Sequence, residues 1–228
     1  MMHDVSLYGH ITVDRIFDDF NESLCLGAVV NSWSALMQID PHLKVKLNPA
    51  SYGEAIILVD KQKNFRLGQP QLNIKINKSL NAVESRWHHL MYLNSLPDVS
   101  FLNNIKSGII SADITVGNKN RNLEFLNLLD FLFISDEDLF MDLNDLARRV
   151  KGWTILHSQS GSVCTNGVEF YEQKTSVVDG LNVLGAGDIF ASAFISSSLQ
   201  NLENINDNIK FAHKKTLDLL LKKQLEEY

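Results

Sequence analysis

Apolar residues follow two alternating patterns along this chain. Short continuous runs predict buried strands, and they occupy residues 5–8, 87–93, 107–113, 131–134 and 153–157. Stretches with apolar residues at helical spacing alternate with these runs, at residues 32–37, 123–128, 136–150, 189–195 and 205–228. We interpret the alternation as an α/β fold in which a mainly parallel central sheet is flanked by helices on both faces.

One segment in the first third of the chain departs from this alternation. Residues 54–60 and 65–67 predict an antiparallel hairpin around a polar turn, and apolar and polar residues then alternate over 72–76 as in a half-exposed strand. We interpret residues 54–76 as a β flap or lid inserted into a single domain that spans residues 1–228, because no linker-like or repeated segment divides the chain. Further on, Asn166-Gly167 predicts a type I′ hairpin turn.

Composition and charge exclude several classes of partner. The net charge is −6 and the 21 Lys and Arg residues are scattered, which argues against nucleic acid or an anionic membrane as the main partner. The two cysteines, Cys25 and Cys164, lie far apart and fit no metal spacing, which predicts a reduced, intracellular protein. The N-terminus lacks the pattern of a signal peptide, and no apolar run approaches the roughly 20 residues that span a bilayer. We therefore expect a cytoplasmic location.

Several common catalytic motifs are excluded as well. The chain contains no G-x-x-x-x-G-K-[ST], G-x-S-x-G or H-E-x-x-H sequence. Residues 185–187, Gly-Ala-Gly, do not begin a dinucleotide fingerprint, because Phe190 occupies the third glycine position. The adjacent His88 and His89 would face opposite sides of a strand and could not share a metal, so we interpret both as structural.

One short segment late in the chain combines an anion site with an acid. Residues 184–190 read Leu-Gly-Ala-Gly-Asp-Ile-Phe, where a loop is predicted to become the first turn of a helix. Unpaired backbone N–H groups and the positive end of the helix dipole favour an anion at such a place. Asp188 is placed to accept a proton from a hydroxyl that attacks a phosphoryl group, or simply to cap the helix, and this segment alone favours neither interpretation.

Two earlier stretches carry polar groups suited to a hydroxyl-bearing ligand. The first strand is expected to end at Gly9, which leaves Asp14 beyond the carboxyl end of a strand, where ligands gather in α/β sheets. Gly27 allows the backbone to approach a ligand closely, and Asn31 follows one helical turn later with an amide that donates and accepts. Taken singly, Asp14 is more simply a solvated loop acid, and Asn31 fits a surface residue as well as a ligand contact.

The order of these features resembles the ribokinase-like, or PfkB, family of carbohydrate kinases, over nearly the whole chain. Residues 9–14 match the family pattern G-x-x-x-x-D, residues 26–31 resemble G-G-x-x-x-N, and residues 185–190 match G-A-G-D-x-F, its most specific signature. The resemblance implies a kinase that uses ATP and Mg²⁺.

Individual roles follow from the same resemblance. Asp188 is implied to be the catalytic base. The backbone amides of the three residues before it are implied to form an anion hole, and these are Gly185, Ala186 and Gly187. The sugar site is implied to be lined by Asp14, Gly27 and Asn31.

The chain departs from the family pattern around the donor nucleotide. Residues 135–138 align with the family's N-x-x-E element, with Asp138 as the implied metal-site acid. Residues 156–161 align with its T-x-G-x-x-G loop, of which only Gly161 remains, and Ser158 stands in the loop beside it. Asn182 and Val183 replace the family's D-[ST] pair. Ser158, Gly161 and Asn182 are therefore the expected nucleotide contacts.

The sequence as a whole predicts ATP-dependent phosphorylation of a hydroxyl on a sugar or sugar-like molecule. Two alternatives stay open: a sugar- or nucleotide-binding protein of the same fold without catalysis, suggested by the altered Ser158, Asn182 and Val183, and a kinase of a nucleoside or vitamin alcohol. The exposed edges of the flap and its alternating apolar residues predict a homodimer formed through these strands.

Overall fold

The computed structural model describes residues 2–18, 21–60, 65–71, 80–115 and 122–226. The chain forms two compact units, each assembled from three segments. Unit 1 comprises Met1–Gly9, His42–Ala50 and Lys78–Ser176, and unit 2 comprises His10–Pro41, Ser51–Asn77 and Val177–Tyr228. Strands β1 (His3–Asp18) and β3 (Val45–Asp60) each contribute to both units.

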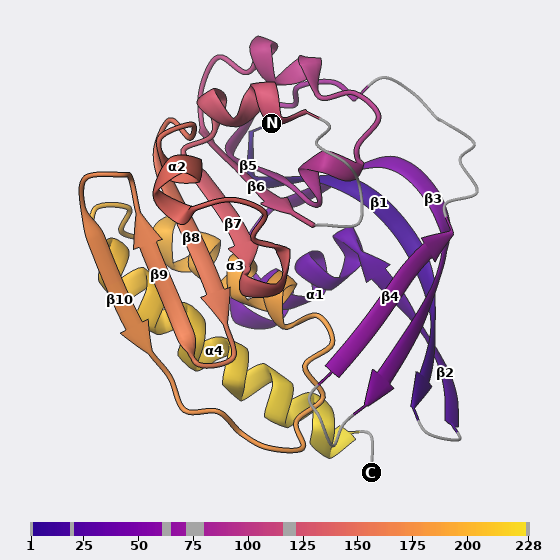
Figure 1. Cartoon of the computed structure of the whole chain (residues 1–228). Helices are drawn as coiled ribbons and strands as arrows, with labels where there is room; N and C mark the ends of the chain where they lie inside the picture. The colour runs from indigo at the N-terminus through magenta and orange to yellow at the C-terminus, as the bar shows by residue number, and fades with distance from the viewer. Residues whose placement is uncertain (1, 19–20, 61–64, 72–79, 116–121, 227–228) are drawn as a thin grey trace. The chain divides into compact units, whose positions relative to one another are not determined.

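Unit 1 is built on a mainly parallel sheet (Figure 1). Its strand order is β10-β9-β8-β7-β6-β5-β1. Strands β1, β5, β6, β7 and β8 pair in parallel, whereas β9 pairs antiparallel with both β8 and β10. The strands beyond β1 are β5 (Ser85–Leu90), β6 (Ile109–Ile114), β7 (Phe131–Ser135), β8 (Trp153–Ser158), β9 (Gly161–Thr165) and β10 (Phe170–Lys174). Helix α2 (Leu143–Ala147) accompanies short 3₁₀ turns, which are η2 (Leu93–Ser95), η3 (Ser100–Asn104), η4 (Leu123–Leu128) and η5 (Asp136–Asp138).

The apolar runs become strands because both of their faces are buried. In β7, Phe131 to Ile134 are all buried, and Leu132 and Ile134 pack in one core with residues of α2 and the 3₁₀ turns such as Leu102, Leu126 and Leu146. A fully buried leucine or isoleucine contributes roughly 1.5–3 kcal/mol relative to an exposed one. The predicted α/β fold with a mainly parallel sheet flanked by helices is therefore confirmed.

The two adjacent histidines of β5 make separate contacts. His88 Nδ1 lies 3.3 Å from the hydroxyl of Tyr8, whereas His89 Nδ1 lies 2.8 Å from Ser111 Oγ and His89 Nε2 lies 3.3 Å from Asp113 Oδ2. Both side chains are buried. These contacts confirm the structural interpretation of the pair.

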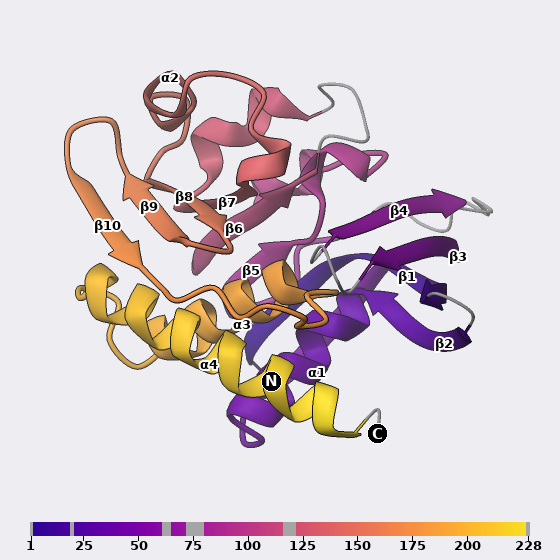
Figure 2. The ribbon, with the colours of Figure 1, turned by 60° about the horizontal axis from the view of Figure 1, so that its bottom comes forward.

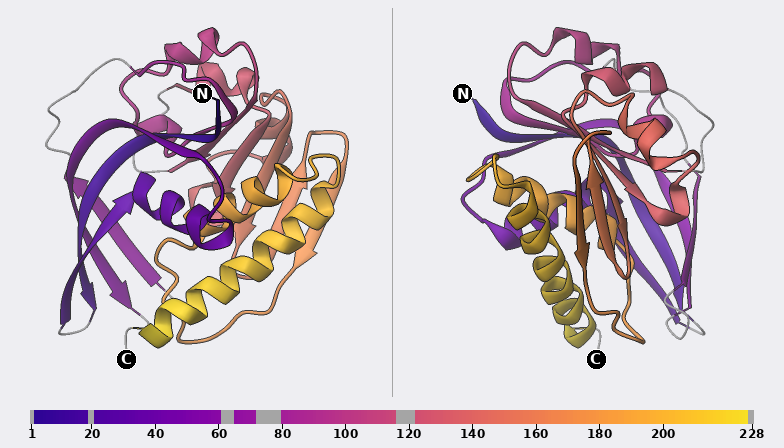
Figure 3. Two further views of the ribbon diagram at one scale, coloured as in Figure 1. Left: turned by 180° about the vertical axis from the view of Figure 1, so that it is seen from behind. Right: turned by 60° about the vertical axis from the view of Figure 1, so that its left-hand side comes forward.

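Unit 2 combines a β flap with three helices (Figure 2). We extend the name flap from the predicted residues 54–76 to four strands in the order β2-β1-β3-β4. In it β2 (Asn21–Ala28) pairs antiparallel with β1, and β4 (Phe65–Gln71) pairs antiparallel with β3. The helices are α1 (Val29–Ile39), α3 (Ala186–Ser198) and α4 (Ile205–Glu226). Helix α3 contacts both others (Figure 3): Ser192 Oγ donates to the Ser32 carbonyl at 3.2 Å, and Ser197 Oγ donates to Asn208 Oδ1 at 2.6 Å.

The two faces of the flap differ sharply in exposure. The inner face is largely buried, and the buried and half-buried side chains on it include Thr12, Asp14, Ile16, Cys25, Ala55, Ile57 and Val59, beside Gly27. The outer face exposes large apolar side chains between 37% and 66% of their surface, and these are Val13, Leu24, Leu26, Tyr52, Ile56 and Leu58. An apolar outer face of this kind is unusual for a surface that meets only water.

Several predicted boundaries are wrong. Strand β1 does not end at Gly9 but continues to Asp18, because its second half pairs with β2, so Asp14 lies within a strand. The turn at Asn166-Gly167 is not type I′: Thr165 pairs with Phe170, which leaves a four-residue loop, and the Asn166 side chain accepts hydrogen bonds from the backbone of the two residues after Gly167. The helical spacing over residues 205–228 predicts that Leu220 and Leu221 both face inward, but only Leu220 is buried and Leu221 is 40% exposed.

The antiparallel pairing of residues 54–60 with 65–71 confirms the predicted hairpin. The expected turn at 61–64 and the strand expected at 72–76 lie outside the described residues. In the described part of the chain, the helices are too short or too polar to cross a membrane.

Candidate active site

The first turn of α3 places an acid beside a glycine loop. Gly185 precedes the helix with a φ of 82°, a left-handed conformation that favours glycine, and the Ile189 N–H bonds to the Gly185 carbonyl at 3.0 Å. Asp188 is the third residue of the helix and is only 5% exposed. The interpretation of Asp188 as the helix cap is therefore wrong, because Gly185 occupies that position.

Asn31 and Asp188 meet between the first turns of α1 and α3. The Asn31 Nδ2 group donates a hydrogen bond to Asp188 Oδ2 at 3.1 Å. A methyl group built on Gly185 would lie 3.8 Å from Asn31 Nδ2 and 3.9 Å from Asp188 Oδ2. The structure thus brings Asn31, Asp188 and Gly185 together, and Asn31 is half-buried rather than a surface residue.

The backbone N–H groups of this loop are not equivalent. The first N–H groups of a helix have no acceptor four residues earlier in the helix. The Ala186 N–H, however, already donates to the Val183 carbonyl at 3.0 Å in a tight turn. An anion at this helix start would therefore be met first by the amides of Gly185 and Gly187.

Asp14 forms a second polar centre in unit 2, on the inner face of the flap. It is 5% exposed, and its Oδ1 atom has no hydrogen-bond partner among the described residues. Burial raises the pKa of Asp14, and a hydrogen bond from the Thr12 hydroxyl opposes that shift. The interpretation of Asp14 as a solvated loop acid is wrong.

Gly27 provides the space for this carboxylate. A methyl group built on Gly27 would lie 1.9 Å from Asp14 Oδ2 and 2.4 Å from Oδ1. The register of β1 and β2 places Gly27 opposite Thr12 and Cys25 opposite Asp14. Gly27 is therefore needed for the position of Asp14, which is a more specific role than allowing a ligand to approach.

Sequence reasoning missed Cys25, which lies opposite Asp14, and Lys223, whose charge acts on Cys25. Burial raises the pKa of Cys25, the negative charge of Asp14 raises it further, and the charge of Lys223 opposes the shift. The signal for Cys25 is its same-face spacing from Gly27, which has meaning only once residues 21–28 are known to be a strand.

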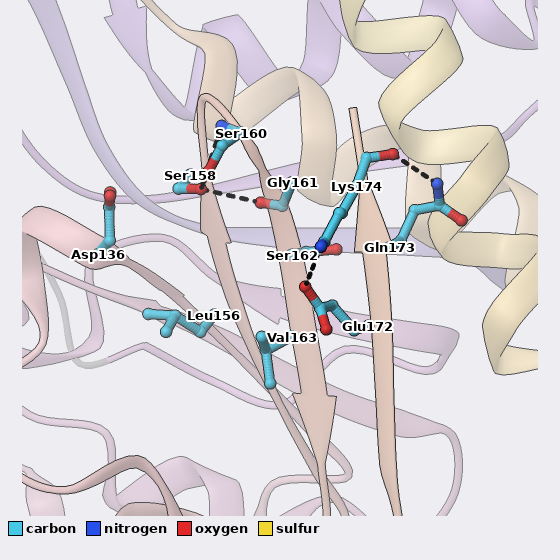
Figure 4. A pocket seen from close by; sticks show the side chains of 10 residues that line it. All are labelled: Asp136, Leu156, Ser158, Ser160, Gly161, Ser162, Val163, Glu172, Gln173 and Lys174. Carbon is cyan, nitrogen blue, oxygen red and sulfur yellow. Dashed lines mark hydrogen bonds and ion pairs between the residues drawn. The ribbon is translucent and has the colours of Figure 1, made fainter. Parts of the chain in front are cut away.

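The expected nucleotide contacts fall in different units. Ser158 and Gly161 line a pocket of about 230 Å³ in unit 1 (Figure 4), where Ser158 Oγ donates to the Gly161 carbonyl at 3.2 Å. The pocket also receives Ser160, Lys174 and Glu172, and the last two approach each other to 3.8 Å. Its volume is below the roughly 300 Å³ at the low end of pockets for drug-sized ligands.

Asn182, the third expected contact, belongs to unit 2 and is buried. Its Oδ1 atom accepts a hydrogen bond from the Leu184 N–H at 3.1 Å. This bond fixes the turn that leads into Gly185, so the structure gives Asn182 a role in the backbone of the loop.

Asp138 ends the 3₁₀ turn η5 and is half-buried. Within the described ranges, no group of three or more His, Cys, Asp or Glu side chains is arranged to hold a metal ion. Magnesium sites of phosphoryl-transfer enzymes often use one or two carboxylates and complete the shell with phosphate oxygens and water. Asp136 of the same turn lines the pocket that holds Ser158 and Gly161, and Asp138 is not among its lining residues.

Comparison with known proteins gives a clear result only for structure. No protein-family model matches the sequence, and no curated protein matches it. The adenosine kinase from Sinorhizobium meliloti matches with a TM-score of 0.75 and 15% identity over 95% of this chain and 93% of that chain. The ribokinase from Thermotoga maritima matches with a TM-score of 0.70 and 17% identity over 92% of this chain and 90% of that chain.

A third similar structure is a pyrophosphate-dependent kinase in the ribokinase family, complexed with a pyrophosphate analog and myo-inositol. It matches with a TM-score of 0.63 and 16% identity over 91% of this chain and 92% of that chain. At sequence identities this low, the matches support a shared fold and not a shared activity. Because the matches cover nearly the full length of this chain and of each matched structure, this chain has the ribokinase-like fold.

Proposed function

We propose that this protein phosphorylates a hydroxyl group of a sugar or sugar-like small molecule, with ATP as the donor. The observation that carries the proposal is the hydrogen bond from Asn31 to Asp188 at the glycine-rich start of α3. The bond holds a buried carboxylate in the first turn of α3, beside backbone amides at the positive end of the helix dipole. A proton acceptor next to an anion site is the minimum that phosphoryl transfer to an alcohol requires.

In this proposal Asp188 accepts the proton of the acceptor hydroxyl as that oxygen attacks phosphorus. Asn31 donates to one carboxylate oxygen, Oδ2, and so orients the other towards the hydroxyl. The amides of Gly185 and Gly187 hold the charge on the transferred phosphoryl group. The Ala186 amide joins them only if its hydrogen bond to the Val183 carbonyl opens.

Asp14 is the proposed recognition group for the acceptor. An unpaired buried acceptor atom costs roughly 1–3 kcal/mol, and Asp14 Oδ1 is in that state among the described residues. A second hydroxyl of the ligand would remove this cost by donating to Oδ1. Gly27 keeps the carboxylate in place, and a polyhydroxylated acceptor fits this pairing better than an apolar one.

The donor side rests on Ser158 and Gly161 in unit 1. When bound, Mg²⁺ would neutralise the donor phosphates, with Asp138 as the protein carboxylate. Pyrophosphate is a second candidate donor. It is favoured by the small volume of the pocket, its serine hydroxyls and Lys174, and by the similarity to a pyrophosphate-dependent kinase.

A homodimer through the flap is part of the same proposal. The outer face of the flap gathers six exposed apolar side chains on adjacent strands, and a second copy of the flap would cover them and the strand edges.

The test is a donor-by-acceptor matrix that combines ATP or pyrophosphate with a panel of sugars and nucleosides, run on the wild type and on Asp188→Asn. We expect transfer to one acceptor class, and a fall of about 10²–10⁴-fold in kcat for Asp188→Asn with an unchanged melting temperature. Near-normal turnover of the variant would refute the role of Asp188. Ligand-induced thermal stabilisation without any phosphoryl transfer by the wild type would instead support the non-catalytic binding protein.

A further inference from the structure

The segment that leads into the anion-binding loop, residues 180–184, is held at both ends by the last turn of α4. Gln224 Nε2 donates to the Gly180 carbonyl at 3.0 Å, and Lys223 Nζ donates to the Leu184 carbonyl at 3.5 Å. Both contacts lie within unit 2 and are partly buried. Two consecutive residues of one helix therefore hold the beginning and the end of the same short segment.

Leu184 is fixed in two further ways. Its side chain is 8% exposed and packs with Ile16, Ala55 and Ile57 of the flap. Its N–H donates to Asn182 Oδ1 at 3.1 Å. The carbonyl contacted by Lys223 is the remaining polar group of this residue.

The Leu184 carbonyl belongs to the same peptide group as the Gly185 N–H. A peptide group is planar, and its C=O and N–H bonds point in opposite directions. A cation that holds the carbonyl therefore also sets the direction of the Gly185 N–H. It also polarises the peptide group, which makes the N–H a stronger donor towards an anion.

We infer that Lys223 is a positioning residue for phosphoryl transfer: through the Leu184 carbonyl it orients and strengthens the Gly185 amide of the anion hole. This inference rests on the proposed function. Gln224 supports it by fixing Gly180 at the other end of the segment. The C-terminal helix thereby takes part in the chemistry without contacting the substrate.

The test compares Lys223→Met, Lys223→Arg and Lys214→Met. Methionine keeps the apolar stem and removes the charge, arginine restores a charged donor, and Lys214 is an exposed lysine of the same helix. Because the anion hole acts in the transition state, we expect Lys223→Met to lower kcat about tenfold with the acceptor KM within about twofold of the wild type. We expect Lys223→Arg to recover most of the loss and Lys214→Met to behave as wild type. An unchanged kcat in Lys223→Met, or an equal loss in all three variants, would overturn the inference.

Amide hydrogen exchange gives a readout that does not depend on turnover. Lys223→Met should speed exchange in a peptide covering residues 181–187, whereas Lys214→Met should leave it unchanged. A wild type that transfers no phosphoryl group to any acceptor would refute the proposed function but leave this measurement intact. Equal exchange in the wild type and Lys223→Met would refute the positioning role itself.

Discussion

The amide of Asn31 donates a hydrogen bond to Asp188 Oδ2 at 3.1 Å, although 157 positions separate the two residues in the chain. The bond favours the ionised carboxylate, which is the form that accepts a proton. Asn31→Ala should therefore lower kcat by about 10–100-fold and move the acidic limb of the pH–rate profile to higher pH. Asn31→Asp should move the limb further, because two carboxylates would then lie side by side. A profile unchanged in both variants would show that Asn31 does not act on the base.

Gly27→Ala tests the space beneath Asp14. The added methyl group would overlap the Asp14 carboxylate, whose side chain must then turn away. We expect the variant to fold, and the acceptor KM to rise at least about tenfold, as for the loss of a hydrogen bond to a charged group. Ser23→Ala is the matched control, because Ser23 is an exposed residue of the same strand. An acceptor KM that rises equally in both variants would contradict the assignment of Gly27.

Asp14 should also leave a signature in stability. Burial raises its pKa above the usual 3.8, so the folded state binds its proton more tightly than the unfolded state. The resulting cost to stability is absent below a pH of about 3.8 and becomes complete as the pH rises through the raised pKa. Asp14→Asn should therefore melt at a higher temperature than the wild type near neutral pH, with lower affinity for the acceptor. The difference in melting temperature should shrink as the pH falls, and a difference that stays constant with pH would contradict the prediction.

The two cysteines should differ in reactivity. Burial raises the pKa of both thiols, and that of Cys164 reaches about 12. The two differ in exposure, because Cys164 is buried and Cys25 is only half-buried. A thiol reagent should modify Cys25 slowly in the folded protein and Cys164 only after unfolding. A bound acceptor should slow the labelling of Cys25, which lies opposite Asp14. Mass spectrometry of Cys25→Ser provides the control, and rapid labelling of that variant under native conditions would contradict the prediction.

The outer face of the flap predicts the oligomeric state. Leu24 and Leu26 are 66% and 52% exposed. If two flaps pack together, Leu24→Glu with Leu26→Glu should convert a dimer to a monomer in light scattering at micromolar concentration, because buried carboxylates without partners are strongly unfavourable. Val168→Glu, at an exposed position of the loop between β9 and β10, should leave the mass unchanged. A wild-type monomer would refute the dimer.

Much of the fold could be predicted from sequence because its parallel strands are buried on both faces. Runs such as Phe131 to Ile134 contain no polar residue, so they can be identified as buried strands from the sequence. The flap was harder to predict. Its strand β2 exposes Leu24 and Leu26 while burying Gly27, so its apolar positions do not mark the buried face. The continuation of β1 past Gly9 depends on pairing with that unpredicted strand.

The candidate site divides in the same way. Asp14, Gly27, Asn31 and Asp188 could be found because they stand in motifs of fixed spacing. The contact between Asn31 and Asp188 depends on the packing of α1 against α3, and no local pattern contains it. Lys223 could not be found either, because its partner is a backbone carbonyl 39 positions away.

The burial of Leu184 among Ile16, Ala55 and Ile57 has a consequence for engineering substrate preference. A library aimed at the flap would naturally include Ile57, since it faces inward and packs with Ile16. Yet a smaller residue there would also loosen Leu184, the residue directly before the glycine loop. A variant from such a library could therefore lose turnover for two reasons: the substrate fits less well, or the catalytic backbone is displaced. Measuring substrate affinity together with the rate of each variant would separate the two.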